Sequence, residues 1–352
     1  MIQLKEKFAA DYVHYYDVDG NYVYNNSNVY RAKLAGKDYA FSVQRDLVNA
    51  ASSLSRPARR LTRNGVSEVL YDTEGNRLVI FAFGKISVYD LGSRQLDETG
   101  SFRRGRCPLF TGSLLSRTKR MYFGEYYSNN DGEEVYIFAS DDGGYHFEPI
   151  FRFPKNSIRH VHSINEDPYS DDIWVCCGDY DGECWFFRTD RDFSFVEHFG
   201  DRTQEWRAVS LMFLPDRLVW GIDSPLISDV RVMSLDRKSG QLRKGQILPG
   251  PVWYGRVLDD GAGVLQTSSE PGASLKTSEA QLYVTNDWDR WTKVAAFQKD
   301  ALPGRYFKLG VLMFPRGKQT LRDFGFFAEA LKGVDGRFMV GDASEAVLDR
   351  VA

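Results

Sequence analysis

The sequence predicts an all-β fold, a β-propeller with seven four-stranded antiparallel blades or, alternatively, six. Three observations predict this fold. Strand-forming aromatic residues are frequent, with 19 tyrosines, 24 phenylalanines and 7 tryptophans among 352 residues. Short apolar runs alternate with turns rich in Gly, Asp and Asn. From residue 65 onward this pattern recurs roughly every 40 to 50 residues, the length of one propeller blade.

Six modules follow one another, each with four predicted strands joined by turns. They are residues 65–102, 108–154, 158–199, 205–248, 252–298 and 305–348. Residues 1–64 are less regular, but they alternate like strands at 21–34 and 39–44. We expect this segment to form a seventh blade, or to close the ring by adding strands to the last blade. Since no Pro/Gly/Ser-rich linker divides the chain, we expect one domain over 1–352.

One basic segment precedes the first module. It contains Arg56, Arg59, Arg60 and Arg63. A charge run of this kind is usually solvated, so we expect an exposed connector rather than a binding patch.

The overall charge limits the classes of ligand. The net charge of −3 provides no basic field for nucleic acid, so an anionic ligand would have to be held by local arginines. The first residues lack the apolar core of a signal peptide, and no run of 18 apolar residues occurs. We therefore expect a cytoplasmic protein that does not insert into membranes.

The four cysteines have neither the spacing of a disulfide framework nor that of a zinc site. They are Cys107, Cys176, Cys177 and Cys184. We expect buried, reduced thiols, in agreement with a cytoplasmic location.

Residues 140–147, Ser-Asp-Asp-Gly-Gly-Tyr-His-Phe, fit the pattern Ser-x-Asp-x-Gly-x-x-aromatic and follow a predicted strand. Weaker copies stand at 189–195 and 285–291. On these residues the chain resembles, at the level of the fold, the Asp-box (bacterial neuraminidase repeat) propellers, which include sialidases and other carbohydrate-active families. The resemblance implies that the box aspartates tie turns between third and fourth strands and take no part in catalysis. They are Asp142, Asp190 and Asp287. A sialidase proper is not expected, because the Phe-Arg-Phe-Pro run at 151–154 falls mid-chain at the end of a blade.

Candidate site residues recur at two positions of the module. In a propeller, the loops that enter first strands and those that leave second strands share one face around the central opening. Carboxylates follow the second strands at Glu125, Asp179, Asp223, Glu270 and Glu329. Cationic and aromatic side chains enter the first strands, among them Arg106, Arg159, His160, His162, Trp206, Arg207, Trp253, Tyr254 and Arg305. We expect these groups to ring one opening.

His160 and His162 are two of only five histidines, and their spacing places both imidazoles on one side of a strand. Asp179 follows the next predicted strand. Each of these residues also has a structural alternative. A histidine can be a hydrogen-bonded core residue, an aromatic residue can pack between blades, and Arg207 can clamp a neighbouring aspartate.

The leading hypothesis is β-elimination at a uronic acid in an acidic polysaccharide or oligosaccharide. An imidazole or tyrosinate would remove the C5 proton, a tyrosine or histidine would protonate the leaving oxygen, and an arginine or a metal would neutralise the carboxylate. The residues assigned to catalysis are His160, His162, Tyr254 and Arg207. Those assigned to substrate binding are Arg159, Asp179, Asp223, Glu125, Glu270, Trp206 and Arg305. Propeller lyases of ulvan and oligogalacturonate use similar residue types, which is an analogy of fold and residue type.

Two alternatives remain. A glycoside hydrolase would use two of the ring carboxylates as acid and as base or nucleophile. A non-catalytic propeller would bind a glycan or a protein partner. No cofactor follows with certainty from the sequence, but His160, His162 and Asp179 can ligate a divalent metal ion.

Overall fold

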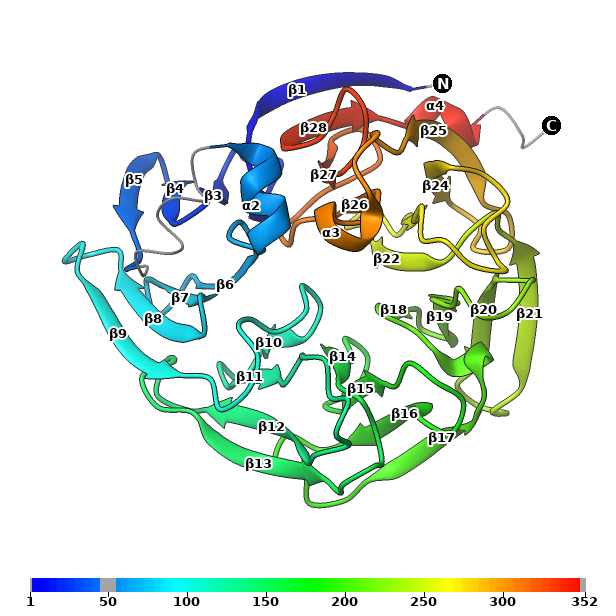
Figure 1. The fold of residues 1–352 in the computed structure, drawn as a ribbon, viewed down its shortest axis with the longest axis horizontal. Helices are drawn as coiled ribbons and strands as arrows, with labels where there is room; N and C mark the ends of the chain where they lie inside the picture. Colours follow the sequence, from blue (N-terminus) through cyan, green and yellow to red (C-terminus); the bar gives the residue numbers. More distant parts are fainter. Residues whose placement is uncertain (1, 45–54, 349–352) are drawn as a thin grey trace. The chain divides into compact units, whose positions relative to one another are not determined.

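The protein is a seven-bladed β-propeller built of four-stranded antiparallel sheets (Figure 1). The computed structural model describes residues 2–44 and 55–348. The first sheet holds β2 (Tyr12–Tyr16), β3 (Tyr22–Asn26), β4 (Val29–Leu34) and β5 (Lys37–Ser42). The second holds β6 (Ser67–Asp72), β7 (Arg77–Ala82), β8 (Lys85–Asp90) and β9 (Leu96–Ser101). The third holds β10 (Ser113–Leu115), β11 (Met121–Gly124), β12 (Val135–Ser140) and β13 (Glu148–Phe153). The fourth holds β14 (Val161–Glu166), β15 (Ile173–Cys177), β16 (Cys184–Thr189) and β17 (Glu197–Arg202).

The last three sheets follow in chain order. The fifth holds β18 (Met212–Phe213), β19 (Arg217–Gly221), β20 (Arg231–Asp236) and β21 (Leu242–Ile247). The sixth holds β22 (Val252–Val257), β23 (Gly263–Thr267), β24 (Glu279–Thr285) and β25 (Thr292–Gln298). The seventh holds β26 (Val311–Met313), β27 (Phe324–Glu329), β28 (Arg337–Asp342) and the N-terminal strand β1 (Gln3–Ala9). The predicted modules therefore correspond to sheets two to seven.

Both expectations for the N-terminal segment are confirmed. Strands β2 to β5 form a blade of their own. Strand β1 pairs antiparallel with β28, from Gln3 opposite Asp342 to Ala9 opposite Arg337, and so completes the last blade. The prediction of four strands within the last module was wrong in this detail, because the fourth strand comes from the other end of the chain.

The chain divides into two compact units, residues 1–65 with 216–352 (the first unit) and residues 66–215 (the second unit). In the second unit, neighbouring sheets pack through continuous apolar cores. One core joins Val79 and Phe81 of β7 to Met121 and Phe123 of β11. The next joins the third and fourth sheets through apolar residues such as Phe187, which is fully buried. Burial of such side chains supplies most of the favourable free energy of folding.

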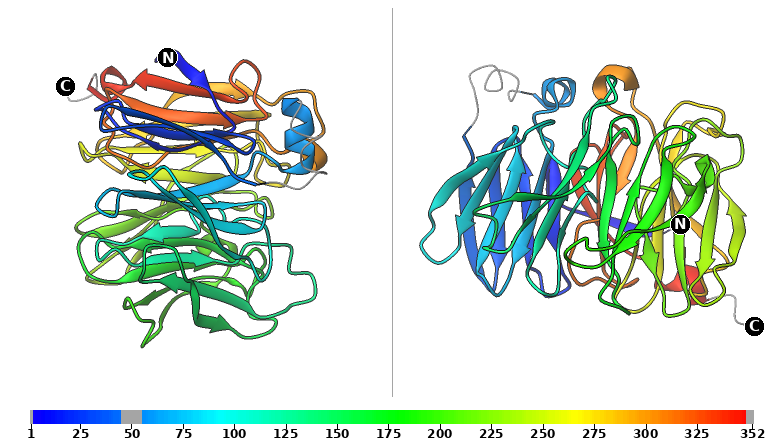
Figure 2. Two further views of the ribbon diagram at one scale, coloured as in Figure 1. Left: turned by 90° about the vertical axis from the view of Figure 1, so that its left-hand side faces the viewer. Right: turned by 90° about the horizontal axis from the view of Figure 1, so that it is seen from below.

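The helices of the described residues are few and short. They are α2 (Arg56–Thr62), α3 (Gly304–Phe307), α4 (Ser344–Leu348) and the 3₁₀ turn η1 (Gln204–Trp206). The side chain of Ser55 caps α2 by accepting a hydrogen bond from the Ala58 amide. Helices α2 and α3, both in the first unit, lie side by side at the same end of the strands (Figure 2). In the described parts of the chain, no helix has the length and apolar character needed to span a membrane.

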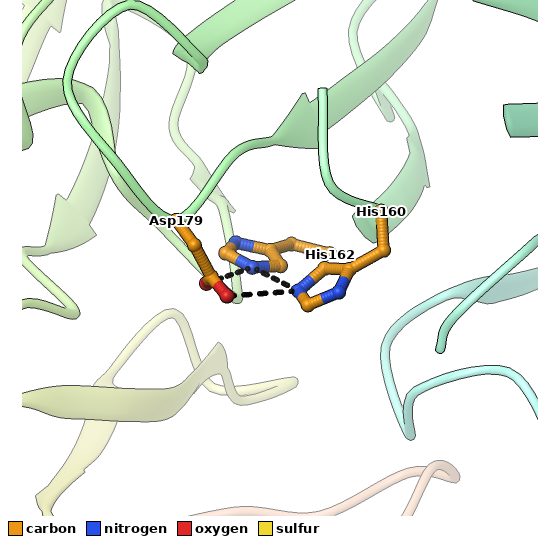
Figure 3. A group of neighbouring side chains, drawn as sticks. All are labelled: His160, His162 and Asp179. Carbon is orange, nitrogen blue, oxygen red and sulfur yellow. Dashed lines mark hydrogen bonds and ion pairs between the residues drawn. The ribbon is translucent and has the colours of Figure 1, made fainter. Parts of the chain in front are cut away.

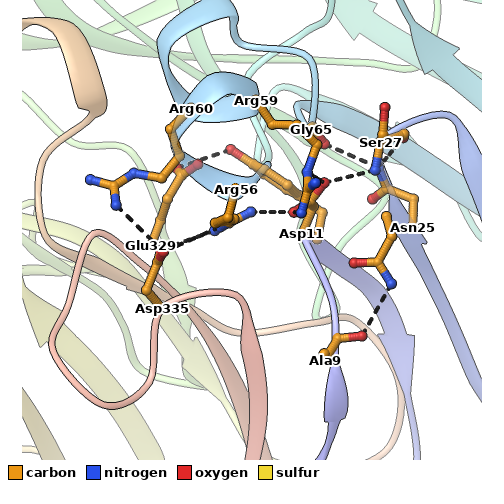
Figure 4. Close-up of polar contacts among 12 residues, drawn as sticks. Ala9, Asp11, Asn25, Ser27, Arg56, Arg59, Arg60, Gly65, Glu329 and Asp335 are labelled. Atoms are coloured by element: carbon orange, nitrogen blue, oxygen red, sulfur yellow. Dashed lines mark hydrogen bonds and ion pairs between the residues drawn. The ribbon is translucent and has the colours of Figure 1, made fainter. Parts of the chain in front are cut away.

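Arg56, Arg59 and Arg60 of α2 are not exposed, so the predicted exposed connector was wrong for these three, whereas Arg63, which follows the helix, is exposed as predicted. Arg60 is only 3% exposed; its Nη1 lies 2.5 Å from the Asp300 carboxylate, and its Nε donates to the Phe307 carbonyl over 2.8 Å. Arg56 contacts Asp11 and Asp335 (Figure 4). The partners come from distant parts of the chain, and a local charge pattern does not encode them.

The Ser-x-Asp-x-Gly-x-x-aromatic segment at residues 140–147 forms the expected turn between the third and fourth strands of its blade. Asp142 Oδ1 accepts hydrogen bonds from the backbone amides of Tyr145 and His146 over 3.0 and 2.9 Å. The Ser140 hydroxyl donates to the same oxygen over 2.8 Å and accepts from the Gly144 amide. The weaker copies form equivalent Asp-centred turns after β16 and β24. The box aspartates are therefore structural in all three turns.

We expect Asp142→Ala to lower the free energy of unfolding by about 1 kcal/mol at neutral pH, because the variant loses several turn hydrogen bonds. Burial opposes ionisation of Asp142, but hydrogen bonds from His146 and Ser140 outweigh it and lower the pKa to about 2 from the ordinary 3.8. A depressed carboxyl pKa stabilises the fold above the ordinary value, and this stabilisation is lost as the pH falls through the folded-state pKa. The difference between variant and wild type should therefore shrink between pH 3.8 and about 2.

Urea unfolding at both ends of this pH range measures the effect. Asp97→Ala, at an exposed position of β9, is the control and should leave the unfolding curve unchanged. A difference between Asp142→Ala and wild type that stays constant over the whole range would contradict the assignment.

All four cysteines are free and buried, which confirms the prediction of reduced thiols. Burial raises the pKa of the Cys176 and Cys184 thiols to about 12. These thiols are therefore unreactive core residues.

Candidate functional site

Loops that leave second strands lie beside the chain that enters the next blade. The Val161 amide at the start of β14 donates to the Glu125 carbonyl just after β11, over 3.1 Å. A glycine makes this approach possible, since a Cβ added at Gly124 would lie 2.5 Å from Val161 Cβ. The same arrangement recurs in the first unit, where Gly221 faces Val252. The two positions singled out in the sequence are thus neighbours in space.

The second unit brings His160, His162 and Asp179 together (Figure 3). The Nε2 atoms of the two imidazoles are 3.1 Å apart. Asp179 Oδ1 lies 3.2 Å from His162 Nε2, and Asp179 Oδ2 lies 3.6 Å from His160 Nε2. The two imidazoles therefore lie together as expected, but strand alternation is not the reason, because His160 precedes β14.

A β-bulge directs His162 into this cluster. In the pairing of β14 with β15, Val161 opposes Cys177 and Ser163 opposes Cys176, so His162 is the extra residue of β14. A bulge re-aims one side chain without disrupting the rest of the ladder. Asp179 is placed by Gly178, which has a φ of +104° and where a Cβ would lie 2.2 Å from the Glu183 carbonyl oxygen.

Each imidazole is fixed by a hydrogen bond at its other nitrogen. His160 Nδ1 lies 3.2 Å from the Tyr127 carbonyl oxygen, and His162 Nδ1 lies 3.1 Å from the Ala208 carbonyl oxygen. A carbonyl can only accept, so each Nδ1 carries the proton and donates it. In the neutral rings, both Nε2 lone pairs therefore point toward each other and toward Asp179.

Two arginines flank the carboxylate. Arg207, which follows η1, donates from Nη1 to the Asp179 carbonyl over 2.8 Å and places Nη2 3.1 Å from Asp179 Oδ1. Arg159 Nε lies 3.6 Å from Asp179 Oδ2. The side chain of Arg207 is 10% exposed and that of Arg159 is 22% exposed. Both guanidiniums hold Asp179 in place, and Arg159 also reaches the solvent.

The cluster carries one excess positive charge when its imidazoles are neutral. Burial lowers the pKa of His160, and the hydrogen bond with Asp179 only partly offsets this effect. Burial alone would raise the pKa of Asp179, but its contacts with His160 and His162, whose Nε2 atoms donate when the rings are protonated, outweigh burial and hold the pKa well below the ordinary range. With one carboxylate and two guanidiniums, the cluster attracts anions even though the whole chain is weakly acidic.

Two tyrosines border the cluster, and the sequence analysis did not assign them to the site. The ring of Tyr126 lies against His160, with the ring centroids 4.3 Å apart. The Tyr180 hydroxyl accepts a hydrogen bond of 2.7 Å from Arg159 Nη1, and its ring lies beneath that guanidinium. Tyr126 is 36% exposed and Tyr180 is 51% exposed. The signal that could have found them is their position directly after the register carboxylates Glu125 and Asp179.

Two other assigned residues of the second unit have structural partners. Glu125 is 1% exposed, and its carboxylate forms a two-pronged ion pair with Arg103 and accepts from the Tyr136 amide. Burial raises the pKa of Glu125, against the effect of Arg103. Trp206 is 7% exposed and packs edge-on against Phe186. Their assignment to substrate binding stays a prediction.

The first unit holds the remaining assigned residues. Tyr254 is buried in β22 and lies edge-on to Trp253, whose Nε1 donates to Glu270 over 3.1 Å. Asp223 is buried just after β19. Arg305 is exposed in α3, over the ring of Tyr306. Their assigned roles also stay predictions.

Comparisons with known proteins agree on the fold. No family model and no curated protein matches the sequence. The structure is similar to that of an oligogalacturonate lyase from Vibrio parahaemolyticus, with a TM-score of 0.58 and 12% identity over 98% of this chain and 94% of that one. It is also similar to U3-55K, with a TM-score of 0.55 and 9% identity over 97% and 98% of the two chains. Hydrazine synthase of Kuenenia stuttgartiensis matches 64% of each chain with a TM-score of only 0.46. At these identities, the first two likenesses show the propeller fold alone.

Proposed function

We propose that the protein is a lyase that cleaves an acidic, uronate-containing oligosaccharide or polysaccharide by β-elimination at the cluster of His160, His162, Asp179, Arg159 and Arg207. The observation that carries the proposal is the convergence of two fixed imidazoles and two guanidiniums on one carboxylate, beside two exposed tyrosines. A binding site for an acidic sugar needs positive charge and aromatic surface. This cluster has both.

The guanidiniums would bind the uronate carboxylate. Neutralising that carboxylate makes the C5 proton easier to remove, because negative charge develops on the carboxylate as the C5–H bond breaks. Arg159 is the more exposed of the two cations, and it already aligns Tyr180 through the hydrogen bond of 2.7 Å. A divalent ion held by the imidazoles would add to the same effect.

Elimination then requires one group to take a proton and one to give it. The C5 proton goes to a base, the C4=C5 double bond forms, the C4–O bond breaks, and the leaving oxygen gains a proton. Tyr180 is suited to donate that proton. Its oxygen accepts from Arg159, so its own O–H is directed elsewhere, and its ring is exposed. The base is Nε2 of His160 or the oxygen of Tyr180.

Hydrolysis is less well supported. A glycosidase needs one carboxylic acid that keeps its proton and a second carboxylate across the scissile bond. The depressed pKa of Asp179 keeps that carboxyl ionised, and the Glu125 carboxylate is occupied by Arg103 and the Tyr136 amide. The fold is also similar to that of an oligogalacturonate lyase, a name that denotes a lyase of an acidic saccharide. This similarity supports the proposal by analogy of fold.

The test is the ultraviolet absorbance of the unsaturated uronate formed during incubation with a panel of uronate-containing saccharides. We expect wild type to produce this absorbance and Tyr180→Phe to reduce the rate about 100-fold or more, since the variant removes the proton donor but keeps the ring. Tyr169→Phe is the matched control, because Tyr169 is equally exposed, at 52%, in the turn between β14 and β15.

The other results have definite meanings. New reducing ends without the absorbance would replace elimination by hydrolysis. Saturable saccharide binding with neither product would make the protein a binding platform. An equal rate for Tyr180→Phe and wild type would remove Tyr180 from proton transfer and leave His160 as the base.

A further inference from the structure

We infer that His160 Nε2, His162 Nε2 and the Asp179 carboxylate form a binding site for one divalent transition-metal ion. The inference deepens the proposed function, since it concerns the same cluster, but it depends on geometry that exists without any saccharide. In the described part of the chain, these three side chains form a group of potential metal ligands. One ligand atom from each lies within 4.8 Å of the other two.

The distances between the three ligand atoms match those around a metal ion. Bonds from zinc to imidazole nitrogen and carboxylate oxygen are about 2.0 to 2.2 Å, so neighbouring ligand atoms of a tetrahedral or octahedral ion are roughly 2.8 to 3.6 Å apart. The observed separations are 3.1 Å between the two Nε2 atoms, 3.2 Å from His162 Nε2 to Asp179 Oδ1 and 3.6 Å from His160 Nε2 to Asp179 Oδ2. A small cation therefore fits between the two imidazole nitrogens and the carboxylate with little movement.

The protonation pattern calls for a cation at this point. Both Nδ1 atoms donate to backbone carbonyls, so both Nε2 atoms are acceptors when the rings are neutral, and the ionised Asp179 is an acceptor as well. Three acceptors at these distances repel one another unless a proton or a metal ion lies between them. Metal-binding histidines usually donate a hydrogen bond from the other ring nitrogen to a carbonyl or carboxylate, because this bond fixes the tautomer and the ring orientation.

His14 provides a comparison within the same chain. It occupies the equivalent bulge, between Val13 and Tyr15 of β2, and it is equally buried. Its Nε2 lies 3.1 Å from the side-chain oxygen of Asn25, with no carboxylate in that position. The Nε2 atom of His14 thus meets an amide oxygen, where that of His162 meets a second imidazole and a carboxylate. The second imidazole and the carboxylate at His162 require a further explanation, which a metal site gives.

The flanking arginines determine how such an ion would behave. A carboxylate has about four acceptor positions, so Asp179 can accept from Arg207 and still ligate a metal. Two guanidiniums, one carboxylate and a divalent ion leave a net charge of about +3 in the cluster. This positive charge opposes metal binding. An anionic ligand such as a uronate should therefore strengthen metal binding, and the metal should strengthen uronate binding by the same factor. With two histidines as ligands, proton transfer in the proposed elimination would fall to Tyr180.

The experiment measures metal retention by the full-length protein without any saccharide. The protein is stripped with EDTA, loaded separately with Zn²⁺, Co²⁺ and Mn²⁺, desalted and analysed for bound metal. We expect about one equivalent of at least one ion in wild type, and a dissociation constant raised at least 100-fold in His162→Ala and Asp179→Asn. A visible absorption band of the Co²⁺ form that is present in wild type and absent from the variants reports direct ligation by these residues.

His198→Ala is the matched control. His198 lies in β17, the outermost strand of the same blade, and its ring contacts the ring of Trp185. It should retain metal like wild type. If His162→Ala fails to fold by circular dichroism, His160→Gln replaces it. Retention below about one tenth of an equivalent by folded wild type, or equal retention by wild type and the ligand variants, would overturn the inference.

The metal and the reaction are tested separately. Metal retention without any unsaturated product would keep the site and reject the proposed lyase. Unsaturated product from EDTA-stripped protein at the full rate would keep the lyase and show that the reaction does not need the metal, while retention still decides whether the site binds one. Galacturonate or glucuronate oligosaccharides that tighten Zn²⁺ binding would support the coupling, and an unchanged Zn²⁺ affinity in their presence would reject it.

Discussion

Replacing Arg207 by Lys is expected to lower kcat/KM for the elimination about 100- to 1,000-fold, mainly through kcat. The guanidinium spans two acceptors of one residue, the carbonyl oxygen and Oδ1 of Asp179, at 2.8 and 3.1 Å. A lysine keeps the charge, but its single ammonium cannot make this forked contact. Asp179 would shift, and with it the orientation of His162 and the position of Arg159.

The measurement is a full kinetic comparison of wild type and variant, accompanied by urea unfolding. Arg188→Lys is the matched control, since Arg188 forms an exposed pair with Glu197 on neighbouring strands of the same blade. Such surface pairs contribute at most about 1 kcal/mol to stability, so the control should change neither rate nor unfolding. Full activity in a folded Arg207→Lys variant would mean that the forked contact of Arg207 with Asp179 is not needed for the reaction.

The fold was predictable because blade periodicity is a property of local sequence. Alternating strands, turn residues and the Asp-box recur at fixed positions, and each needs only its own blade to form. The convergence of His160, His162 and Asp179 was predictable for the same reason, since the loops leaving β15 and entering β14 belong to one blade. Arg207 joined them through the approach of successive blades.

Other details of the site depend on contacts that periodicity does not encode. The bulge at His162 arises from its pairing with β15, and it sets the 3.1 Å separation of the imidazole nitrogens. Glu125 has the same register as Asp179, but Arg103 occupies its carboxylate. Register therefore places a group at the site, and the neighbouring side chains decide whether it is available there.

The arginines of α2 show the same limit on a larger scale. Their sequence predicts a solvated run, yet Arg56 Nη1 lies 2.5 Å from Asp11, and Arg59 Nε lies 2.8 Å from the same carboxylate (Figure 4). Asp335, far along the chain, is a second partner of Arg56. Opposite charges from distant segments of the first unit thus turn a basic segment inward.

Asp11→Ala is accordingly expected to lower the free energy of unfolding by about 3 to 5 kcal/mol, because it removes the carboxylate that two largely buried guanidiniums share. Asp11 is 1% exposed, and it also accepts a hydrogen bond of 2.7 Å from the Ser27 amide. One variant therefore removes an ion pair with each arginine and the bond that holds the turn between β3 and β4. The shift of the urea midpoint measures the effect.

The control is Glu6→Ala, which removes an exposed pair with Arg337 between β1 and β28 and should cost at most about 1 kcal/mol. A double-mutant cycle separates the contributions at Asp11. If the cost comes from the buried charge of Arg56, then Arg56→Ala in the Asp11→Ala background should restore part of the lost stability, since one of the two guanidiniums that lost Asp11 is then removed. Strictly additive losses in the double variant would instead assign the cost to the Ser27 hydrogen bond and the packing of α2.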